Sequence, residues 1–517
     1  MKDLDMEYLT LQNGSDIRGV AVDGVEGEPV NLTPRVLYYI GQAFAAQIIK
    51  KSGKEATQVK IAIGHDSRIS AQSLKNAAIL GLHRVGVQVL DCTLASTPAM
   101  FMSTVLEDVA SDGALMLTAS HLPYNRNGVK LFTADGGYEK EQIAELLVAA
   151  GKMDEAEAET AFENPSAEAI AEQIDLMGSY SKHLCDLICK EVNAPDYAHP
   201  LMGLHIVLDA GNGAGGFFAS RVLEVLGADT TGSQFLEPDG MFPNHIPNPE
   251  KKEAMDAIRK ATVENHADLG LIFDTDADRA AAVFSNGEEI NRNAQIALMA
   301  AIISQEFPYT TVVTDSVTSD ELAVFLQEKL HMRHHRYKRG YRNVINEAIR
   351  LNNEGVETHL AMETSGHGAI KENYFLDDGA YLCVRMVAVL AKCKLQGGSM
   401  EELIADLEYP AEAAEYRFGI KAQDVQQYGT HVLTEFMEFC SWQEDMELAK
   451  ENYEGVRVSF QREDLHGWML LRMSLHDPIM PFNIEAKEVG GVAKIVERVQ
   501  DFFAQCDYLD ISSLQDA

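Results

Sequence analysis

The chain of 517 residues lacks several features that would each indicate a particular class of protein. No apolar run reaches the ~18 residues that a membrane-spanning helix needs, so we expect no transmembrane segment. The first ten residues, MKDLDMEYLT, are acidic and lack the apolar core of a signal peptide, so we expect a cytoplasmic protein. Seven cysteines are scattered without a CxxC or a Cys/His zinc spacing. We therefore expect reduced thiols and no zinc module.

Basic residues are also scarce. The chain has 43 Lys and Arg against 79 Asp and Glu, which gives a formal net charge of −36. Nucleic acids and anionic membranes are bound through basic patches, so the composition predicts no nucleic-acid partner and no membrane partner. An anionic small molecule remains possible as a substrate, because a few clustered Arg and Lys side chains can make one site locally positive.

The length and the hydrophobic pattern predict several α/β domains. A chain of this size is too long for one core, and three or four domains are expected. Three segments, beginning at Val59, Leu204 and Thr310, share one plan: a short apolar strand, a turn of small and acidic residues, then a helical pattern. They predict three similar parallel α/β units. The acidic stretch 151–173 predicts a solvated helix or linker, and a distinct α+β domain is expected after about Pro410.

One serine stands out in the segment LTASHLPYNRNGVKLF, residues 117–132. Ser120 follows an apolar run, His121 comes directly after it, and Lys130 lies a short polar turn later. A hydroxyl with a neighbouring base or cation can act as a nucleophile or phosphoryl carrier. The alternative is that Ser120 only caps a helix at a strand-to-helix turn.

The segment ADLGLIFDTDADR, residues 267–279, predicts a metal site. An apolar strand pattern ends in three alternating aspartates, Asp274, Asp276 and Asp278. Crowded carboxylates on one loop are typical ligands of Mg²⁺. A Ca²⁺-binding EF-hand loop is excluded, because its sixth and twelfth positions would be Arg279 and Ser285 instead of glycine and glutamate.

A strand that ends in Asp-x-Asp also resembles the haloacid-dehalogenase phosphatases. In that family the first aspartate is the nucleophile and the second is the acid, and the next alternate position is usually Thr or Val. Here that position is Asp278. A third carboxylate fits metal ligation better than aspartyl-phosphate chemistry, and the phosphatase is kept as the alternative.

Taken together, the serine and aspartate loops resemble those of the α-D-phosphohexomutase family, which includes phosphoglucomutases and phosphomannomutases. The resemblance extends along most of the chain in the order of the family's motifs. The further matching segments are NGSDIRG (13–19), IAIGHDSRIS (61–70), LDAGNGAGG (208–216), PDGMFPNHIPNPE (238–250) and METSGHG (362–368).

The resemblance weakens in the segment LRMSLHDPIMPFNIE, residues 471–485. The family's last phosphate-binding loop is usually Arg-x-Ser-Gly-Thr-Glu-Pro with another arginine shortly after it. Arg472 and Ser474 are retained, but Leu475 replaces the glycine, His476 replaces the threonine, and Pro481 stands where the later arginine is expected. Fewer contacts to phosphate are expected here, and His476 is a candidate to compensate for them.

The resemblance implies a fold and a division into domains. It implies an α/β protein with three similar mixed α/β domains in series plus a C-terminal α+β domain around a central cleft. The expected domains are residues 1–175 with the phosphoserine loop, 176–295 with the metal-binding loop, 296–410 with the sugar-binding loop, and 411–517 as a phosphate-binding lid.

The resemblance also implies an activity, the interconversion of hexose 1-phosphate and hexose 6-phosphate, of glucose or mannose, through a phosphoserine and a 1,6-bisphosphate. The implied cofactors are Mg²⁺ and a hexose 1,6-bisphosphate activator, and the protein is expected to be a monomer or homodimer. The implied site residues are Ser120, His121, Lys130 and Arg279 for catalysis; Ser120, Asp274, Asp276 and Asp278 for the metal; and Arg18, Glu363, Ser365, His367, Arg472, Ser474 and His476 for the substrate.

Three alternatives remain open at this point. One is a phosphoglucosamine mutase, and another is the haloacid-dehalogenase-like sugar phosphatase that uses Asp274. The third is a relative that binds phosphosugars with negligible turnover, which the altered loop at residues 472–478 suggests.

Overall fold

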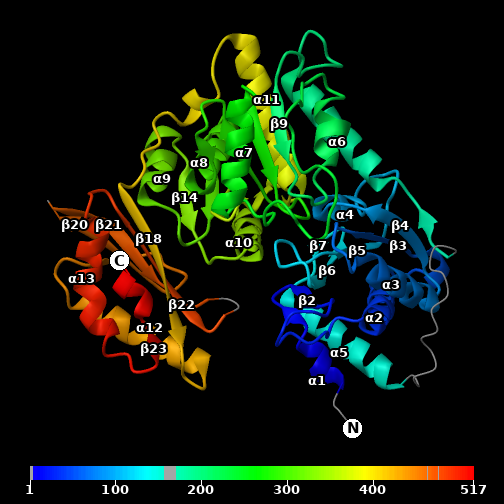
Figure 1. Ribbon diagram of the computed structural model, residues 1–517, viewed down its shortest axis with the longest axis horizontal. Helices are drawn as coiled ribbons and strands as arrows, with labels where there is room; N and C mark the ends of the chain where they lie inside the picture. The colour runs from blue at the N-terminus through cyan, green and yellow to red at the C-terminus, as the bar shows by residue number, and fades with distance from the viewer. Residues whose placement is uncertain (1–3, 157–169, 463, 475–476, 517) are drawn as a thin grey trace. The chain divides into compact units, whose positions relative to one another are not determined.

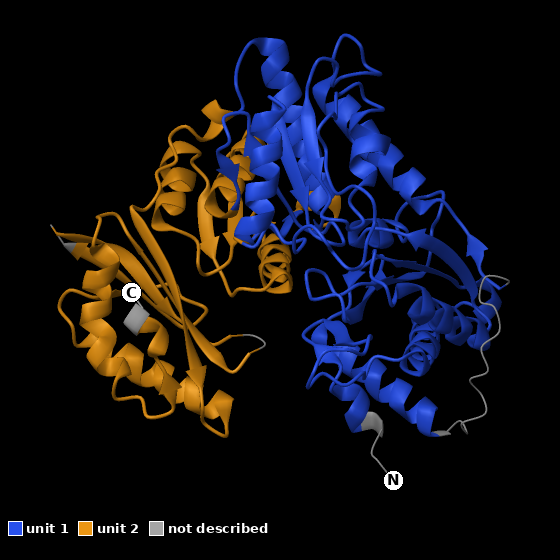
Figure 2. Cartoon of the chain, in the orientation of Figure 1, with its two compact units in different colours: residues 1–291, 365–369, 376–400 blue, residues 292–364, 370–375, 401–517 orange. Residues whose placement is uncertain are grey.

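A computed structural model of the protein describes residues 4–156, 170–462, 464–474 and 477–516. The chain forms two compact units (Figures 1 and 2). The first contains residues 1–291, 365–369 and 376–400, and the second contains residues 292–364, 370–375 and 401–517. Part of the acidic stretch expected to be a linker, residues 157–169, lies outside the described residues.

The first unit contains a mixed sheet in the order β1-β2-β6-β5-β3-β4-β8, with β7 beside β6. β3 pairs in parallel with β4 and β5, whereas β6 runs antiparallel to β5 and β2. The strands are β1 (Gln12–Asn13), β2 (Asp16–Val20), β3 (Lys60–His65), β4 (Gln88–Leu94), β5 (Gly113–Leu117), β6 (Arg126–Thr133), β7 (Gly136–Gly137) and β8 (Glu172–Gln173). The helices of this region are α1 (Leu4–Leu9), α2 (Pro34–Ser52), η1 (Ala56–Gln58), α3 (Ala71–Val85), α4 (Thr97–Met102) and α5 (Lys140–Ala156).

Local sequence signals explain where α2 begins and ends. The side chain of Thr33 accepts a hydrogen bond from the N–H of Val36, and Pro34 occupies the first helical turn. Gly53 ends the helix in the left-handed conformation, φ 65°, which costs glycine little. The buried faces of α2, α3 and α5 pack with strand residues such as Ile61, Leu115 and Val129 into one apolar core.

The first unit also contains a four-stranded sheet, in the order β12-β11-β10-β9. β9 and β10 are parallel, and β11 returns antiparallel to β10. The strands are β9 (Ile206–Asp209), β10 (Leu269–Phe273), β11 (Ala280–Phe284) and β12 (Glu289–Ile290), and the helices are α6 (Leu176–Val192), η4 (Ala219–Leu223), α7 (Lys252–Glu264) and α11 (Gly379–Gln396). The helix expected after the strand of the second segment is only the short π-helix η4, so that part of the common plan is not regular.

The second unit combines parallel strands with a C-terminal antiparallel sheet. β13 (Thr311–Thr314) pairs in parallel with β14 (Arg333–Arg336) and β15 (Thr358–Met362). The helices here are α8 (Arg292–Ser304), α9 (Asp320–Val324), the π-helix η5 (Phe325–Lys329), α10 (Tyr341–Asn353), η6 (Lys371–Asn373) and η7 (Glu401–Ile404). Two short strands follow β15 in the chain, β16 (Gly368–Ile370) and β17 (Leu376–Asp377).

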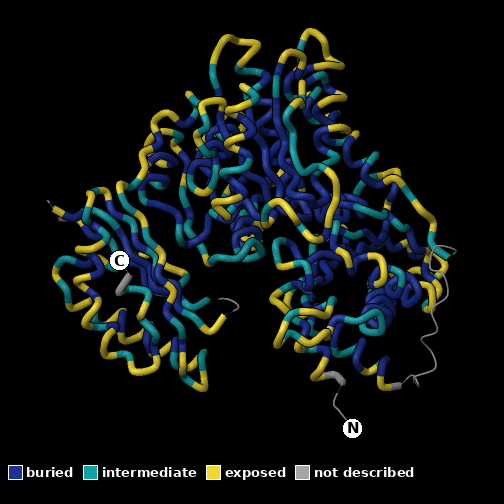
Figure 3. The backbone as a smooth tube through the Cα atoms, viewed as in Figure 1, coloured by how far each residue is buried: buried dark blue, intermediate teal, exposed yellow. Residues whose placement is uncertain are grey.

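The C-terminal sheet has the order β19-β20-β21-β22-β18-β23. Its strands are β18 (Glu412–Ile420), β19 (Glu447–Leu448), β20 (Val456–Arg462), β21 (Leu465–Leu471), β22 (Ile479–Ala486) and β23 (Leu509–Asp510). α12 (Val425–Ser441) and α13 (Gly491–Phe503) supply core residues that pack with this sheet, and η8 (Ser512–Asp516) follows. This is the α+β pattern that the sequence predicts after about Pro410. The strands of both units are largely buried (Figure 3).

Candidate active site

Ser120 lies in the turn between β5 and β6, and no helix begins there. The interpretation of Ser120 as a helix cap is therefore wrong. Its backbone is left-handed, with φ 48°. This conformation is energetically unfavourable for any residue that has a side chain. The hydroxyl of Thr118 accepts a hydrogen bond from the N–H of Ser120 at 2.9 Å, and the serine is 6% exposed. The strained, buried turn holds a single hydroxyl in a defined position.

Arg68, which follows β3, holds this turn in place through hydrogen bonds. Its guanidinium donates to the carbonyl oxygens of Ser120, Leu122, Pro123 and Arg126, and its side chain is buried. Burial lowers the pKa of Arg68, but a guanidinium stays charged at neutral pH. Sequence reasoning predicted no specific contact for Arg68, and the structure shows that it binds the backbone of the serine turn.

Arg18, predicted to bind substrate, also contacts this turn. Its Nη1 donates to the carbonyl of Thr118 at 2.6 Å, and its Nη2 pairs with Asp16 at 2.7 Å. β2 pairs with β6, and a Cβ at Gly128 in β6 would lie 2.1 Å from the carbonyl oxygen of Ile17. Only glycine allows the two strands to approach so closely.

The three predicted aspartate ligands lie together on the loop between β10 and β11. Asp274, Asp276 and Asp278 are fully buried, and each offers a carboxylate oxygen within 4.8 Å of the others. Among the residues that the structure describes, one oxygen of Asp276 and one of Asp278 are buried with no hydrogen-bond partner. Buried oxygens of this kind cost free energy unless a cation binds them, so the residues fit a divalent metal ion.

Ser120 and Lys130 contact the aspartates directly. The Ser120 hydroxyl donates to Asp274 Oδ2 at 3.0 Å, and the Lys130 ammonium forms an ion pair with Asp278 and lies 3.6 Å from Asp276 Oδ2. Burial raises the pKa of Asp274 well above its usual range, and the two neighbouring carboxylates add to this. Burial would also raise the pKa of Asp278, but the charges of Lys130 and His367 outweigh it and hold the pKa low.

Arg279 connects the aspartate loop with the serine turn. Its Nε lies 3.2 Å from Asp274 Oδ2, and its Nη2 lies 3.3 Å from Ser120 Oγ and 2.6 Å from His121 Nδ1. Burial and the charge of Arg279 lower the pKa of His121 to about 2. His121 is therefore neutral at physiological pH, with Nδ1 accepting and Nε2 carrying the proton.

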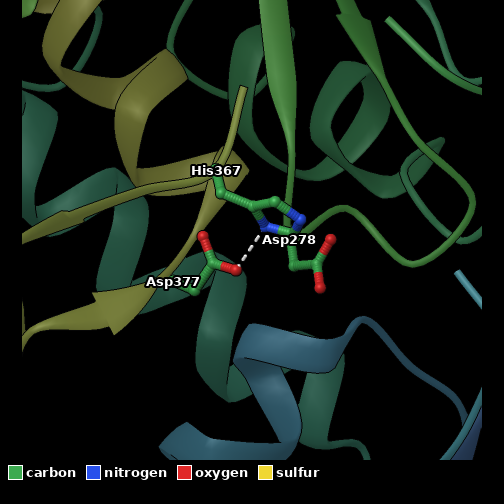
Figure 4. A group of neighbouring side chains, drawn as sticks. All are labelled: Asp278, His367 and Asp377. Carbon is green, nitrogen blue, oxygen red and sulfur yellow. Dashed lines mark hydrogen bonds and ion pairs between the residues drawn. The ribbon is translucent and has the colours of Figure 1, made fainter. Parts of the chain in front are cut away.

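His367 lies between Asp278 and Asp377 (Figure 4). Its Nδ1 is 2.5 Å from Asp377 Oδ2, and the N–H of Gly368 donates to Asp377 Oδ1 at 3.0 Å. Burial would lower the pKa of His367, but the carboxylates of Asp377 and Asp278 outweigh it and raise the pKa to about 9. An imidazolium is thus held beside the aspartate loop.

The other predicted substrate residues are divided between the two compact units. Ser365 is buried in the first unit, whereas Glu363, Arg472 and Ser474 belong to the second. Glu363 Oε1 accepts from the N–H of Gly340 at 2.6 Å. Arg472 is 6% exposed and donates to the carbonyl of Met473 at 3.3 Å. His476 lies outside the described residues.

Thr97 and Asp377 are among the residues that sequence reasoning missed and that contact predicted ones. Thr97, at the start of α4, bonds to Asp276, and Asp377, on β17, bonds to His367. A signal for Asp377 exists in the doublet Asp377-Asp378 shortly after the METSGHG motif. Thr97 in ASTPAM has the pattern of an ordinary helix start, and the neighbouring Ser96 does cap α4.

The fold agrees with comparisons to known proteins. Three domain models match the chain, all described as phosphoglucomutase/phosphomannomutase, alpha/beta/alpha: domain I over residues 10–156, domain II over 178–287 and domain III over 291–409. The chain belongs to the phosphoglucomutase/phosphomannomutase family, that is, the α-D-phosphohexomutases. The predicted family, fold class and enzyme class, a phosphotransferase of the mutase type, are confirmed.

Among the relatives, a phosphomannomutase/phosphoglucomutase of Pseudomonas syringae pv. tomato is 28% identical over 96% of this chain and 94% of its own. A phosphoglucosamine mutase of Lactobacillus delbrueckii subsp. bulgaricus is also 28% identical, but over 75% of this chain and 81% of its own. A family protein from Burkholderia thailandensis shares the fold with a TM-score of 0.71, 24% identity and coverage of 98% and 97%. The N-acetylphosphoglucosamine mutase of Aspergillus fumigatus, solved with GlcNAc-6P and magnesium, has a TM-score of 0.55, 13% identity and coverage of 98% and 99%.

No described helix is both long and apolar enough to cross a membrane.

Proposed function

We propose that this enzyme interconverts hexose 1-phosphate and hexose 6-phosphate, with glucose or mannose as the sugar, and that Ser120 carries the phosphoryl group. The observation that carries the proposal is the position of the Ser120 hydroxyl. It lies 3.0 Å from Asp274 Oδ2 and 3.3 Å from Arg279 Nη2, at the buried aspartate loop. A hydroxyl beside metal ligands and a guanidinium is suited to phosphoryl transfer, which depends on positioning and on neutralisation of charge.

Each half of the reaction exchanges one O–P bond for another. In the first half, the bond from Ser120 Oγ to phosphorus breaks, a bond from the sugar hydroxyl to phosphorus forms, and the hydroxyl proton passes to a base. The resulting 1,6-bisphosphate turns around in the site, its other phosphoryl group returns to Ser120, and a proton returns to the sugar oxygen. Arg279 stabilises the oxygens of the phosphoryl group as it moves.

The sequence leaves Lys130 and His121 as the candidates for acid–base work. Burial and the charge of Arg279 keep the imidazole of His121 neutral, and the hydrogen bond from Arg279 occupies its Nδ1. Both support a role for His121 as a hydrogen-bond donor through Nε2. Lys130 lies beside Asp276 and Asp278 and is the better candidate for proton transfer.

We further propose Mg²⁺ as the divalent metal, held by Asp274, Asp276, Asp278 and the phosphorylated Ser120. The all-oxygen ligand set supports this choice. When bound, the ion would neutralise charge on the transferring phosphoryl group. A hexose 1,6-bisphosphate is proposed as the activator that phosphorylates Ser120.

The remaining predictions from the sequence stay proposals. Glu363 and Ser365 are proposed to bind the sugar, and Arg18, Arg472, Ser474 and His476 to bind phosphate. His367 is proposed as a further substrate-binding residue that assists in gripping the phosphate. The domains are proposed as residues 1–175, 176–295, 296–410 and 411–517, in a cytoplasmic monomer or homodimer that binds no nucleic acid and no membrane.

The test is a coupled assay with glucose 1-phosphate, Mg²⁺ and a trace of glucose 1,6-bisphosphate. Glucose 6-phosphate should form rapidly in the native enzyme and at a background rate in Ser120→Ala. Mannose and glucosamine phosphates run in the same assay would rank the sugars and test the phosphoglucosamine mutase alternative. Release of inorganic phosphate that survives Ser120→Ala but not Asp274→Asn would establish the phosphatase instead.

A further inference from the structure

Thr97 makes two hydrogen bonds to one proposed metal ligand. Its N–H donates to the main-chain carbonyl of Asp276 at 2.9 Å, and its hydroxyl donates to Asp276 Oδ2 at 2.5 Å. Thr97 is 3% exposed and is the first residue of α4. It lies in the region matched by the domain I model, whereas Asp276 lies in the region matched by the domain II model. Both residues belong to the first compact unit.

The two oxygens of Asp276 are in different environments. Oδ2 accepts the Thr97 hydroxyl and has Lys130 Nζ at 3.6 Å, whereas Oδ1 is buried with no partner among the described residues. An aspartate carboxylate rotates easily about its last torsion, because that torsion has a broad energy profile. A hydrogen bond to one oxygen fixes the rotation and leaves the other oxygen directed at whatever the site binds.

We propose that Thr97 is a positioning residue for the metal: its hydroxyl fixes the carboxylate of Asp276 so that Oδ1 is the ligating oxygen. The inference rests on the metal site of the proposed function and adds a residue outside the aspartate loop to it. Thr97 does not touch the metal. It acts through Asp276, as hydrogen-bond partners of metal ligands do in other metalloproteins.

The chain offers matched variants. Thr97→Val has nearly the same shape and keeps the main-chain bond but removes the hydroxyl, whereas Thr97→Ser keeps the hydroxyl and removes a methyl group. Thr104→Val is the control for loss of a buried threonine hydroxyl nearby, since Thr104 is 8% exposed and its hydroxyl donates to the carbonyl of Phe101. Of these three substitutions, only Thr97→Val removes the side-chain hydrogen bond to Asp276.

The experiment measures binding of Mn²⁺, as a probe for Mg²⁺, to the full-length proteins by electron paramagnetic resonance of the unbound ion. Thr97→Val should raise the Kd by about 10- to 100-fold, while Thr97→Ser and Thr104→Val stay within about 3-fold of the native value. The Mg²⁺ concentration for half-maximal mutase activity should rise in parallel in Thr97→Val, and excess Mg²⁺ should restore kcat.

Two results would overturn the assignment. Native Mn²⁺ affinity in Thr97→Val would show that the hydroxyl does not support the ligand. Equal weakening in Thr97→Val and Thr97→Ser would mean that packing, and not the hydroxyl, is responsible. If the native protein bound no Mn²⁺, the metal site itself would fail, while Ser120-dependent mutase activity would be judged separately by the coupled assay.

Discussion

Replacement of Arg68 by lysine tests how the serine turn is held in place. Arg68 donates to four main-chain carbonyls, at 2.7 Å to Pro123, 2.9 Å to Arg126, 2.6 Å to Leu122 and also to Ser120. The planar guanidinium presents its donors in a rigid fork, whereas lysine has a single ammonium nitrogen. Arg68→Lys keeps the positive charge but can satisfy only part of this set.

The magnitude follows from the number of bonds lost. A hydrogen bond from a charged donor contributes about 1.5–3 kcal/mol, so the loss of two corresponds to roughly 3–6 kcal/mol. Water that enters the gap and binds the exposed carbonyls reduces the expected cost to about 2–4 kcal/mol. At 1.4 kcal/mol for each factor of ten, the turn should open about 30- to 700-fold more often.

The assay is native-state hydrogen exchange of the amides of Ser120, Leu122 and Arg126, which are hydrogen-bonded within the turn. Their exchange should accelerate by the factor given above, and kcat of the mutase reaction should fall with it, since Ser120 must be held in place to accept phosphate. The control is Arg84→Lys, at an exposed position of α3. Unchanged exchange of these three amides in Arg68→Lys would refute the reasoning.

Three further predictions follow from the structure. A Cβ at Gly379 would lie 2.6 Å from the carbonyl carbon of Arg279, so Gly379→Ala should displace the aspartate loop, destabilise the protein by about 1–3 kcal/mol and weaken Mn²⁺ binding. In the control Gly398→Ala the nearest contact of the new Cβ is 3.9 Å, so this variant should be neutral. Equal Mn²⁺ affinity in the two variants would contradict the prediction. Burial raises the pKa of Glu485 from 4.5 to about 7 despite a hydrogen bond from Trp468, so its contribution to stability is complete below pH 4.5 and is lost as the pH rises through 7. Urea unfolding followed by tryptophan fluorescence should therefore show that this group makes the protein up to about 3 kcal/mol less stable at pH 8 than at pH 5. The difference should vanish in Glu485→Gln but persist in Glu497→Gln, a control at an exposed position. A stability difference that survives Glu485→Gln would show that another group causes it. Burial and the charge of Arg279 lower the pKa of His121 to about 2, so its imidazole should remain neutral in NMR spectra of the metal-free, unphosphorylated protein between about pH 5 and pH 9. The contribution of this histidine to the stability of the fold should be lost only on acidification below pH 6.5, and a titration midpoint near 6.5 would contradict both its burial and its contact with Arg279.

The sequence alone determined those features that depend on neighbours along the chain. The apolar run before Asp274 predicts a buried strand, and the alternation of three aspartates after it predicts a metal loop, because both signals lie within thirteen residues. The caps of α2 and the change of pattern after about Pro410 are equally local. The order of the motifs then identified the family, which the domain comparisons confirm.

Tertiary structure decided which side chains meet. Lys130 pairs with Asp278 across 148 positions, Thr97 bonds to Asp276 across 179, and Asp377 holds His367. The left-handed backbone of Ser120 likewise depends on Arg68, which reaches the turn from the end of another strand. A hydrogen bond needs its donor and acceptor within about 3 Å, and which distant groups come that close is set by the packing of sheets and helices, which no local pattern of residue types encodes.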